Sequence, residues 1–281
     1  MYEKWKGVHT RCAFNMIQEL IPLTRPRTLA ATLGPTILGA AFSYYAFGAA
    51  QGTGLAIFHT MLIFLAVVTA QIVANLWNEY KDFKSGLDAG QKVGNAGSIT
   101  RGVITPELII TMIKVLMFVP IIIGLYLSAT ITWYYIPVGF LCILISFLYS
   151  GGPKPISRTP FGEISSGIAM GFAIVLITGY AWIRELSLAL LIPAIPSTLL
   201  VGSIMLTNNI RDIRNDESHG RHTLPIVLGR ERALSLMSIS YIFNFIWIIA
   251  WIIVSHMTWF ALLAFLAAPL AFKTIHTLST N

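Results

Sequence analysis

Residues 55–82, LAIFHTMLIFLAVVTAQIVANLWNEYKD, decide the fold class of this chain. The apolar run at its start is long enough for a helix to cross roughly 30 Å of hydrocarbon. Its apolar residues follow one another and do not alternate with polar ones, as they would in a barrel strand. The run ends in amides and carboxylates. The stretch therefore predicts a transmembrane helix that carries polar ligands at one end.

The composition of the whole chain agrees with this prediction. The 281 residues are 56% hydrophobic and only 11% charged, and the mean hydropathy is +0.73, whereas soluble domains carry about 25% charged residues. We therefore expect an all-α polytopic membrane protein. The two cysteines, Cys12 and Cys142, offer neither a disulfide framework nor a metal-binding pattern.

Eight apolar segments predict a bundle of eight transmembrane helices. Their approximate bounds are 28–48, 54–77, 107–128, 131–150, 162–182, 186–207, 233–254 and 257–278. We expect residues 1–24 to form a cytoplasmic, interfacial segment and residues 25–281 to form one transmembrane domain. Five prolines inside the apolar segments predict kinked helices, at Pro120, Pro137, Pro193, Pro196 and Pro269.

Basic residues are distributed unevenly among the connections. Sixteen of the nineteen Lys and Arg residues lie in the N-terminal segment or in the connections after the second, fourth and sixth segments, and the opposite connections hold only Arg184. The positive-inside rule predicts that the N-terminus and these three loops are cytoplasmic, in a plasma or inner membrane. This distribution accounts for the net charge of +7 by membrane orientation, so we expect a lipid bilayer as partner and no nucleic acid.

Half of the twelve Asp and Glu residues lie in two clusters, after the second and sixth segments. If the second helix continues through Asp82, four polar residues at i, i+3, i+4 and i+7 share one face. These four are called the first strip: Asn75, Asn78, Glu79 and Asp82. Three residues spaced by four form the second strip: Asn208, Asp212 and Asp216.

Both strips offer hard oxygen ligands, which favour Mg²⁺ over Zn²⁺. Mg²⁺ usually binds a few carboxylates together with substrate phosphates, so the strips predict a polyphosphate held by metal ions. Nearby bases could neutralise the remaining charge: Lys81, Lys84, Arg101, Arg211, Arg214 and Arg221. The alternative is that the acids are solvated helix ends paired with Lys or Arg. The amides near hydrocarbon, Asn75 and Asn208, favour a site.

The motifs resemble those of the UbiA superfamily of intramembrane aromatic prenyltransferases. The first strip, read as Asn75-Leu-Trp-Asn78-Glu79-Tyr-Lys-Asp82 with Asp88 following, is similar to the first aspartate-rich motif, and Asp212-Ile-Arg-Asn-Asp216 to the second. Three stretches resemble the branch that prenylates 1,4-dihydroxy-2-naphthoate: TRPRTLAATLGPTILGAA, GGPKPISRTPFGE and NNIRDIRNDESHGRHTLPIVLGRERA. The resemblance covers about residues 24–235.

The resemblance implies a helical bundle around a lipid-facing cavity, in which both strips hold Mg²⁺ and a polyprenyl diphosphate. Loss of pyrophosphate gives an allylic cation, an electron-rich ring captures it, and the ring carboxylate is lost to give a demethylmenaquinone. The residues expected to carry catalysis are Asn78, Asp82, Asp212 and Asp216. Glu79 stands where many members have Asp, and the family usually has nine spans, against eight predicted here.

Three basic residues outside the strips are candidates for binding substrate anions. Arg25 matches the family's Arg-Pro motif, although it could serve only as a topology anchor. Lys154 or Arg158 could meet the acceptor carboxylate, with Glu163 nearby. The Gly- and Pro-rich stretch that holds them could instead be only a stiff turn.

Other functions compatible with the sequence are prenyl transfer to homogentisate, 4-hydroxybenzoate or a glycerol phosphate, a cation-binding transporter or channel, and a non-catalytic quinone- or lipid-binding scaffold. A transport path should carry polar residues to both faces, whereas here the outer half is nearly free of charge. A scaffold would tolerate loss of the acids. We therefore expect a prenyltransferase.

Overall fold

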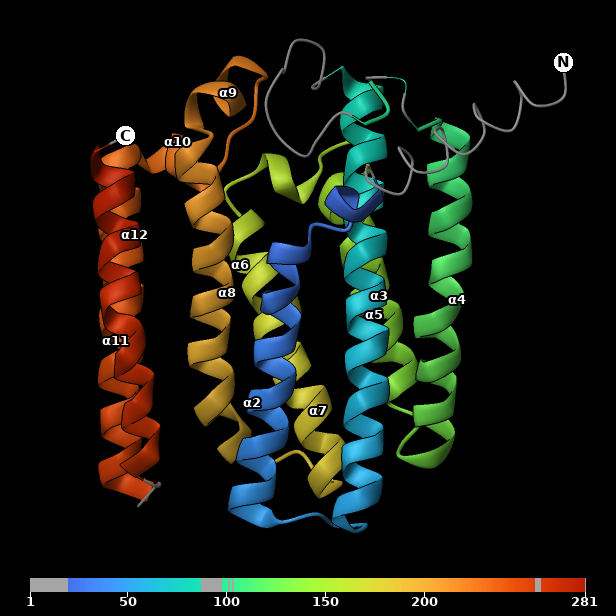
Figure 1. The fold of residues 1–281 in the computed structure, drawn as a ribbon, viewed down its shortest axis with the longest axis vertical. Coiled ribbons are helices and arrows are strands. Elements are labelled where there is room, and N and C mark those ends of the chain that lie inside the picture. The colour runs from blue at the N-terminus through green and yellow to red at the C-terminus, as the bar shows by residue number, and fades with distance from the viewer. Residues whose placement is uncertain (1–19, 87–97, 101, 103, 256–258, 281) are drawn as a thin grey trace, which may run out of the picture. The chain divides into compact units, whose positions relative to one another are not determined.

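The computed structural model describes residues 20–86, 98–100, 102, 104–255 and 259–280. Over these residues the secondary structure is helical, without strands (Figure 1). The chain divides into two compact units, which are described separately: unit 1 comprises residues 1–33 and 61–153, and unit 2 comprises residues 34–60 and 154–281. Most of the predicted segment 1–24 lies outside the described residues, and residues 20–23 are helical.

Helices occupy all eight predicted ranges. Among the described residues, six helices are long and apolar enough to cross a membrane: 53–85, 106–130, 162–183, 188–211, 230–254 and 259–280. Helix α5 (Tyr135–Ser150) is apolar but shorter, and α2 (Ala30–Phe47) is not among the six. The all-helical, multi-pass class is confirmed, whereas the count of eight spanning helices is not.

In unit 1, the core forms where α3 (Thr53–Ser85) meets α4 (Pro106–Thr130), α5 and the residues that precede α4. Its buried members are Leu23, Val73, Leu76, Ile99, Ile104, Ile109 and Ile113. The Trp77 indole N–H donates to the Phe147 carbonyl at 3.0 Å and so joins α3 to α5. Because Trp77 precedes Asn78, this contact also fixes the helix turn that carries the first strip.

In unit 2, α8 (Leu191–Arg211) packs against a second long helix. That helix consists of α6 (Gly162–Ser166), a π-helical segment (Gly167–Phe172) and α7 (Ala173–Ile183). A Cβ atom added at Gly171 would lie 2.6 Å from the Thr198 Cα atom. Small residues allow membrane helices to approach this closely, so glycine is needed at this contact.

The second strip lies at the end of α8 and in α9 (Ile213–Ser218). The chain continues through α10 (Leu224–Leu228), α11 (Arg230–Ser255), a 3₁₀ segment (Trp259–Ala267) and α12 (Ala268–Thr280). Helices α11 and α12 are in contact and lie side by side, in red in Figure 1. The Arg230 guanidinium donates to the carbonyls of Ile210 and Leu278, which ties the end of α8 to α11 and α12.

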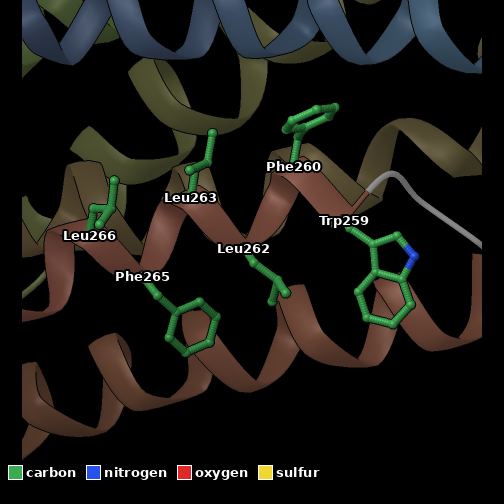
Figure 2. Close-up of a pocket in the computed structure, with 6 residues that line it drawn as sticks. All are labelled: Trp259, Phe260, Leu262, Leu263, Phe265 and Leu266. Carbon is green, nitrogen blue, oxygen red and sulfur yellow. The ribbon is translucent and has the colours of Figure 1, made fainter.

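Large apolar side chains cover much of the outer surface. Phe118 on α4 is 62% exposed and Phe272 on α12 is 71% exposed, as expected for faces that contact lipid. A hollow of about 670 Å³ lies along one segment (Figure 2) and is lined by Trp259, Phe260, Leu262, Leu263, Phe265 and Leu266. Since this lining has no carboxylate or amide, the hollow is not a candidate catalytic site.

The prolines fall into two groups. Pro120 and Pro196 lie inside α4 and α8, so the kinks expected there stay predictions. Pro137, Pro193 and Pro269 lie in the first turns of α5, α8 and α12. A helix tolerates proline in its first turn, because the N–H groups there have no partner within the helix.

Gly171→Ala is expected to destabilise the folded protein by about 1–3 kcal/mol, because the added methyl group overpacks the contact with α8. Thermal unfolding in detergent measures this loss. Gly124→Ala in α4 is the matched control, since a Cβ atom there meets nothing within 4 Å and alanine favours a helix more than glycine does. An unchanged melting temperature for Gly171→Ala would contradict the contact.

Candidate active site

The first strip lies on one continuous helix. The expectation that the second helix continues through Asp82 is correct, because α3 extends to Ser85. Asn75, Asn78, Glu79 and Asp82 therefore keep the helical spacing that places them along one face. The geometry of each side chain, however, depends on partners outside α3.

Asn78 and Asp82 form a hydrogen-bonded pair held by α5. The Asn78 Nδ2 group donates to Asp82 Oδ2 at 3.0 Å, and the Ser150 hydroxyl donates to Asn78 Oδ1 at 2.9 Å. Because Ser150 occupies the amide oxygen, the amide nitrogen is directed to Asp82. Ser150 was not among the predicted site residues, since a serine at the end of an apolar segment carries no motif.

Glu79 and Asn75 bind the backbone of neighbouring segments. Glu79 is 2% exposed, and its Oε1 atom accepts the backbone N–H of the buried Ser98 at 2.8 Å. The Asn75 Nδ2 group donates to the Thr24 carbonyl at 3.0 Å. These bonds hold the backbone at Thr24 and at Ser98 against α3. The roles of Asn75 and Glu79 as metal ligands stay predictions.

Two predicted substrate-binding lysines lie over aromatic rings on α3. The Lys81 ammonium is 5.2 Å from the Trp77 ring centroid, and the Lys84 ammonium is 5.5 Å from that of Tyr80. Cation–π contacts of this kind orient a lysine while leaving its charge in place. Arg101 and Asp88 lie outside the described residues.

The second strip crosses the junction between α8 and α9. Helix α8 ends at Arg211, and Asp212 leaves helical geometry with φ −99° and ψ 10°. Even so, the Asp212 N–H donates to the Asn208 carbonyl at 3.0 Å, and the Asp216 N–H donates to the Asp212 carbonyl at 2.9 Å. Each member of the strip is therefore linked to the member four residues later by a backbone hydrogen bond of the α-helical type, although the regular helix is broken at Asp212.

The two aspartates of the second strip lie in different environments. Asp212 forms two hydrogen bonds with the Arg211 guanidinium, at 2.9 and 2.8 Å, and this pair is largely exposed. Asp216 is 3% exposed, and its Oδ1 atom is 3.3 Å from the Arg221 guanidinium. Burial raises the pKa of the Asp216 carboxyl, although Arg221 partly offsets the effect.

Arg158, before α6, and Glu163, in α6, contact residues on either side of Asp212 within unit 2. The Arg158 carbonyl accepts the His222 N–H at 2.9 Å. The Asn209 Nδ2 group donates to Glu163 Oε1 at 2.8 Å. Asn209 was missed as a site residue, although it follows Asn208 directly in the sequence. Lys154 is exposed.

Arg25 lies just before the first 3₁₀ turn, Pro26–Leu29, in unit 1. Its backbone is left-handed, with φ 50°, and its N–H donates to the Pro22 carbonyl at 2.9 Å. Such a backbone is uncommon for a residue with a side chain. Arg25 therefore lies in the turn through which the chain enters α2. Its contact with substrate stays a prediction.

The donors of both strips are amide and carboxylate oxygens, which fit a hard divalent cation. No group of three or more His, Cys, Asp or Glu side chains that could hold a metal ion occurs in the part of the chain that the structure describes. Each strip combines two carboxylates with one or two side-chain amides. The first strip belongs to unit 1 and the second strip to unit 2, so each is described by itself.

The sequence is similar to known proteins along most of its length. A profile of the UbiA prenyltransferase family matches residues 33–280. The 1,4-dihydroxy-2-naphthoate octaprenyltransferase of Bacillus subtilis is 37% identical over 91% of this chain and 80% of its own. The protein of the same name from Mycobacterium tuberculosis is 30% identical over 89% of this chain and 82% of its own.

The fold is similar to a solved membrane protein. A UbiA homologue from Archaeoglobus fulgidus, bound to GPP and Mg²⁺, superimposes with a TM-score of 0.64. It is 17% identical, and the match covers 92% of this chain and 85% of that chain. At this identity the similarity concerns the fold.

Proposed function

Because the chain belongs to the UbiA prenyltransferase family, and is therefore a multi-pass membrane prenyltransferase, we propose that its acceptor is 1,4-dihydroxy-2-naphthoate. In the proposed reaction an isoprenyl chain moves from a polyprenyl diphosphate to the naphthoate ring, with loss of the ring carboxylate. The product is a demethylmenaquinone. The observation that carries this acceptor is the 37% identity to the Bacillus subtilis enzyme over 91% of the chain.

We propose that Mg²⁺ is the cofactor and that the oxygen donors of each strip bind it together with diphosphate oxygens. The oxygen donors of Asn78, Asp82, Asp212 and Asp216 support this, as does the Mg²⁺ bound with GPP in the Archaeoglobus fulgidus homologue. When bound, Mg²⁺ would stabilise the charge that develops on the leaving pyrophosphate.

The side chains of the first strip have separate roles in this proposal. Asn78, held by Ser150, fixes the Asp82 carboxylate, which would bind the metal–diphosphate group. Lys81 and Lys84, held by their ring contacts, neutralise phosphate charge. The allylic C–O bond breaks, a C–C bond forms to the ring carbon that bears the carboxylate, and that group leaves as CO₂. Apolar surroundings keep water from capturing the cation.

We propose that the protein lies in the plasma membrane with its N-terminus and both strips on the cytoplasmic side. The support is the distribution of Lys and Arg, sixteen of nineteen of which lie in the N-terminal segment and three loops. Soluble diphosphate and naphthoate groups would then reach the strips from the cytoplasm, while the prenyl chain stays among apolar helices.

Purified protein is expected to convert 1,4-dihydroxy-2-naphthoate and an isoprenyl diphosphate into a prenylated naphthoquinol when Mg²⁺ is present. Replacing Mg²⁺ with EDTA should lower the rate by at least about 10²-fold. Mass spectrometry of the product, with donors of several chain lengths, measures both results. Parallel reactions with 4-hydroxybenzoate and homogentisate test the acceptor. Product with one of these, and none with the naphthoate, would refute the proposed acceptor.

A further inference from the structure

The segment of residues 154–163 contacts residues close to the second strip at two points in unit 2. Near its middle, the Arg158 carbonyl accepts the His222 N–H at 2.9 Å, just after the α9 helix. At its end, Glu163 Oε1 accepts the Asn209 amide at 2.8 Å, in the last turn of α8. One contact therefore lies on each side of the junction at Asp212.

Glu163 is an unusual residue for this position. It lies in the first turn of a predicted membrane span and is only 4% exposed. Its Oε2 atom has no hydrogen-bond partner among the described residues. A buried carboxylate near hydrocarbon is costly unless it is paired or hydrogen-bonded, and Glu163 forms a side-chain hydrogen bond with Asn209.

Asn209 lies where α8 needs support. It follows Asn208 and precedes Asp212, at whose position the regular helix ends. The last turn of a helix lacks intrahelical partners for its carbonyl groups and frays readily. Helix α6 approaches α8 closely, since a Cβ atom at Gly202 would lie 3.3 Å from the Glu163 carbonyl oxygen. The Glu163–Asn209 bond thus fixes the last turn of α8, which contains Asn208 and is followed directly by Asp212.

We propose that Glu163 is a positioning residue that holds the second strip in the geometry that binds the metal–diphosphate group. It acts through Asn209 and does not itself touch the substrate. The proposal rests on the part of the proposed function that assigns diphosphate binding to the second strip. It does not depend on which aromatic acceptor is used.

The test measures binding of geranyl S-thiolodiphosphate, an unreactive diphosphate, in saturating Mg²⁺ by titration calorimetry. Glu163→Ala is expected to weaken this binding by about tenfold or more, as the loss of an outer-shell partner does at other metal sites. Glu163→Gln keeps an oxygen that can accept the Asn209 amide and should stay within about threefold of wild type. Glu231→Gln, an exposed acid at the start of α11, is the control that should bind like wild type.

Asn209→Ala should weaken binding as much as Glu163→Ala, and the double variant should be no weaker than either, because one contact is lost in all three. Asn209→Ala also carries the test if Glu163→Ala does not fold. A purely structural role would lower the melting temperature without ligand and leave binding unchanged. That result, additive losses, or equal losses in Glu163→Gln and Glu163→Ala would overturn the proposal.

Asp212→Asn distinguishes failure of the positioning role of Glu163 from failure of the proposal that the second strip binds the diphosphate. If Asp212→Asn loses binding while Glu163→Ala and Asn209→Ala keep it, only the positioning role is wrong. If wild type binds the thiolodiphosphate and Asp212→Asn binds it equally well, the second strip is not the diphosphate site. The proposed site and the role of Glu163 would then both be refuted.

Discussion

Asp82→Asn is expected to abolish prenyl transfer, lowering kcat by at least about 10³-fold, while the protein stays folded. The carboxylate oxygen of Asp82 accepts the Asn78 amide at 3.0 Å, and an amide oxygen can accept the same hydrogen bond. The substitution therefore preserves the shape of the site and removes its charge. Turnover with Mg²⁺ and thermal unfolding, measured on the same preparation, separate the two effects.

Glu107→Gln is the matched control for Asp82→Asn. Glu107 is an exposed acid in the first turn of α4, in the same unit and outside the strip. We expect its turnover to stay within about twofold of wild type, as surface substitutions away from a site usually have small effects. If Asp82→Asn kept at least a tenth of the wild-type turnover, the first strip would not be the metal site.

The positions of the helices could be predicted from the sequence. A helix that crosses hydrocarbon needs a long continuous apolar segment, and such segments are easily recognised. Helices lie in each of the eight ranges, and α3 extends through Asp82 as the first strip requires. The number that span the membrane is a harder problem. Helix α5 has only 16 residues, so length alone does not decide whether it crosses.

Local departures from regular helix were not predictable from apolar patterns. The π-helical segment Gly167–Phe172 lies where Gly171 meets the backbone of Ser197 and Thr198. The break at Asp212 likewise has no signal in the apolar pattern of the sequence. The spacing of apolar residues predicts which face of a helix is apolar. It does not predict which other helix packs against that face.

The sequence predicted the acids and amides of the candidate site. It did not predict the residues that form hydrogen bonds with them. Spacing along one helix placed Asn78 and Asp82 together. Ser150, which fixes Asn78 at a sequence separation of 72 residues, belongs to another helix and has no local signal. Glu79 likewise has a partner that its motif did not predict, because its Oε1 atom accepts the Ser98 N–H.

Asp216→Asn is expected to lower turnover as strongly as Asp82→Asn, by at least about 10³-fold. Asp216 is almost fully buried and faces the Arg221 guanidinium at 3.3 Å. In a buried site a charge is screened little by water, so its removal changes cation binding more than it would at an exposed position. Glu217→Gln, at the exposed neighbouring residue outside the strip, should retain wild-type turnover.

The pH dependence of Mg²⁺ binding gives a second measurement of Asp216. Burial raises the pKa of this carboxyl, so it takes up a proton at a higher pH than an ordinary aspartate does. Protons and Mg²⁺ compete for the carboxylate. As pH falls through the raised pKa, the Mg²⁺ concentration needed for half-maximal binding of geranyl S-thiolodiphosphate should therefore rise in the wild type and in Glu217→Gln. The titration should begin above the range of exposed aspartates. If the Mg²⁺ requirement were the same in Asp216→Asn as in wild type across this pH range, Asp216 would not be a ligand, because its charge would then have no effect on the bound cation.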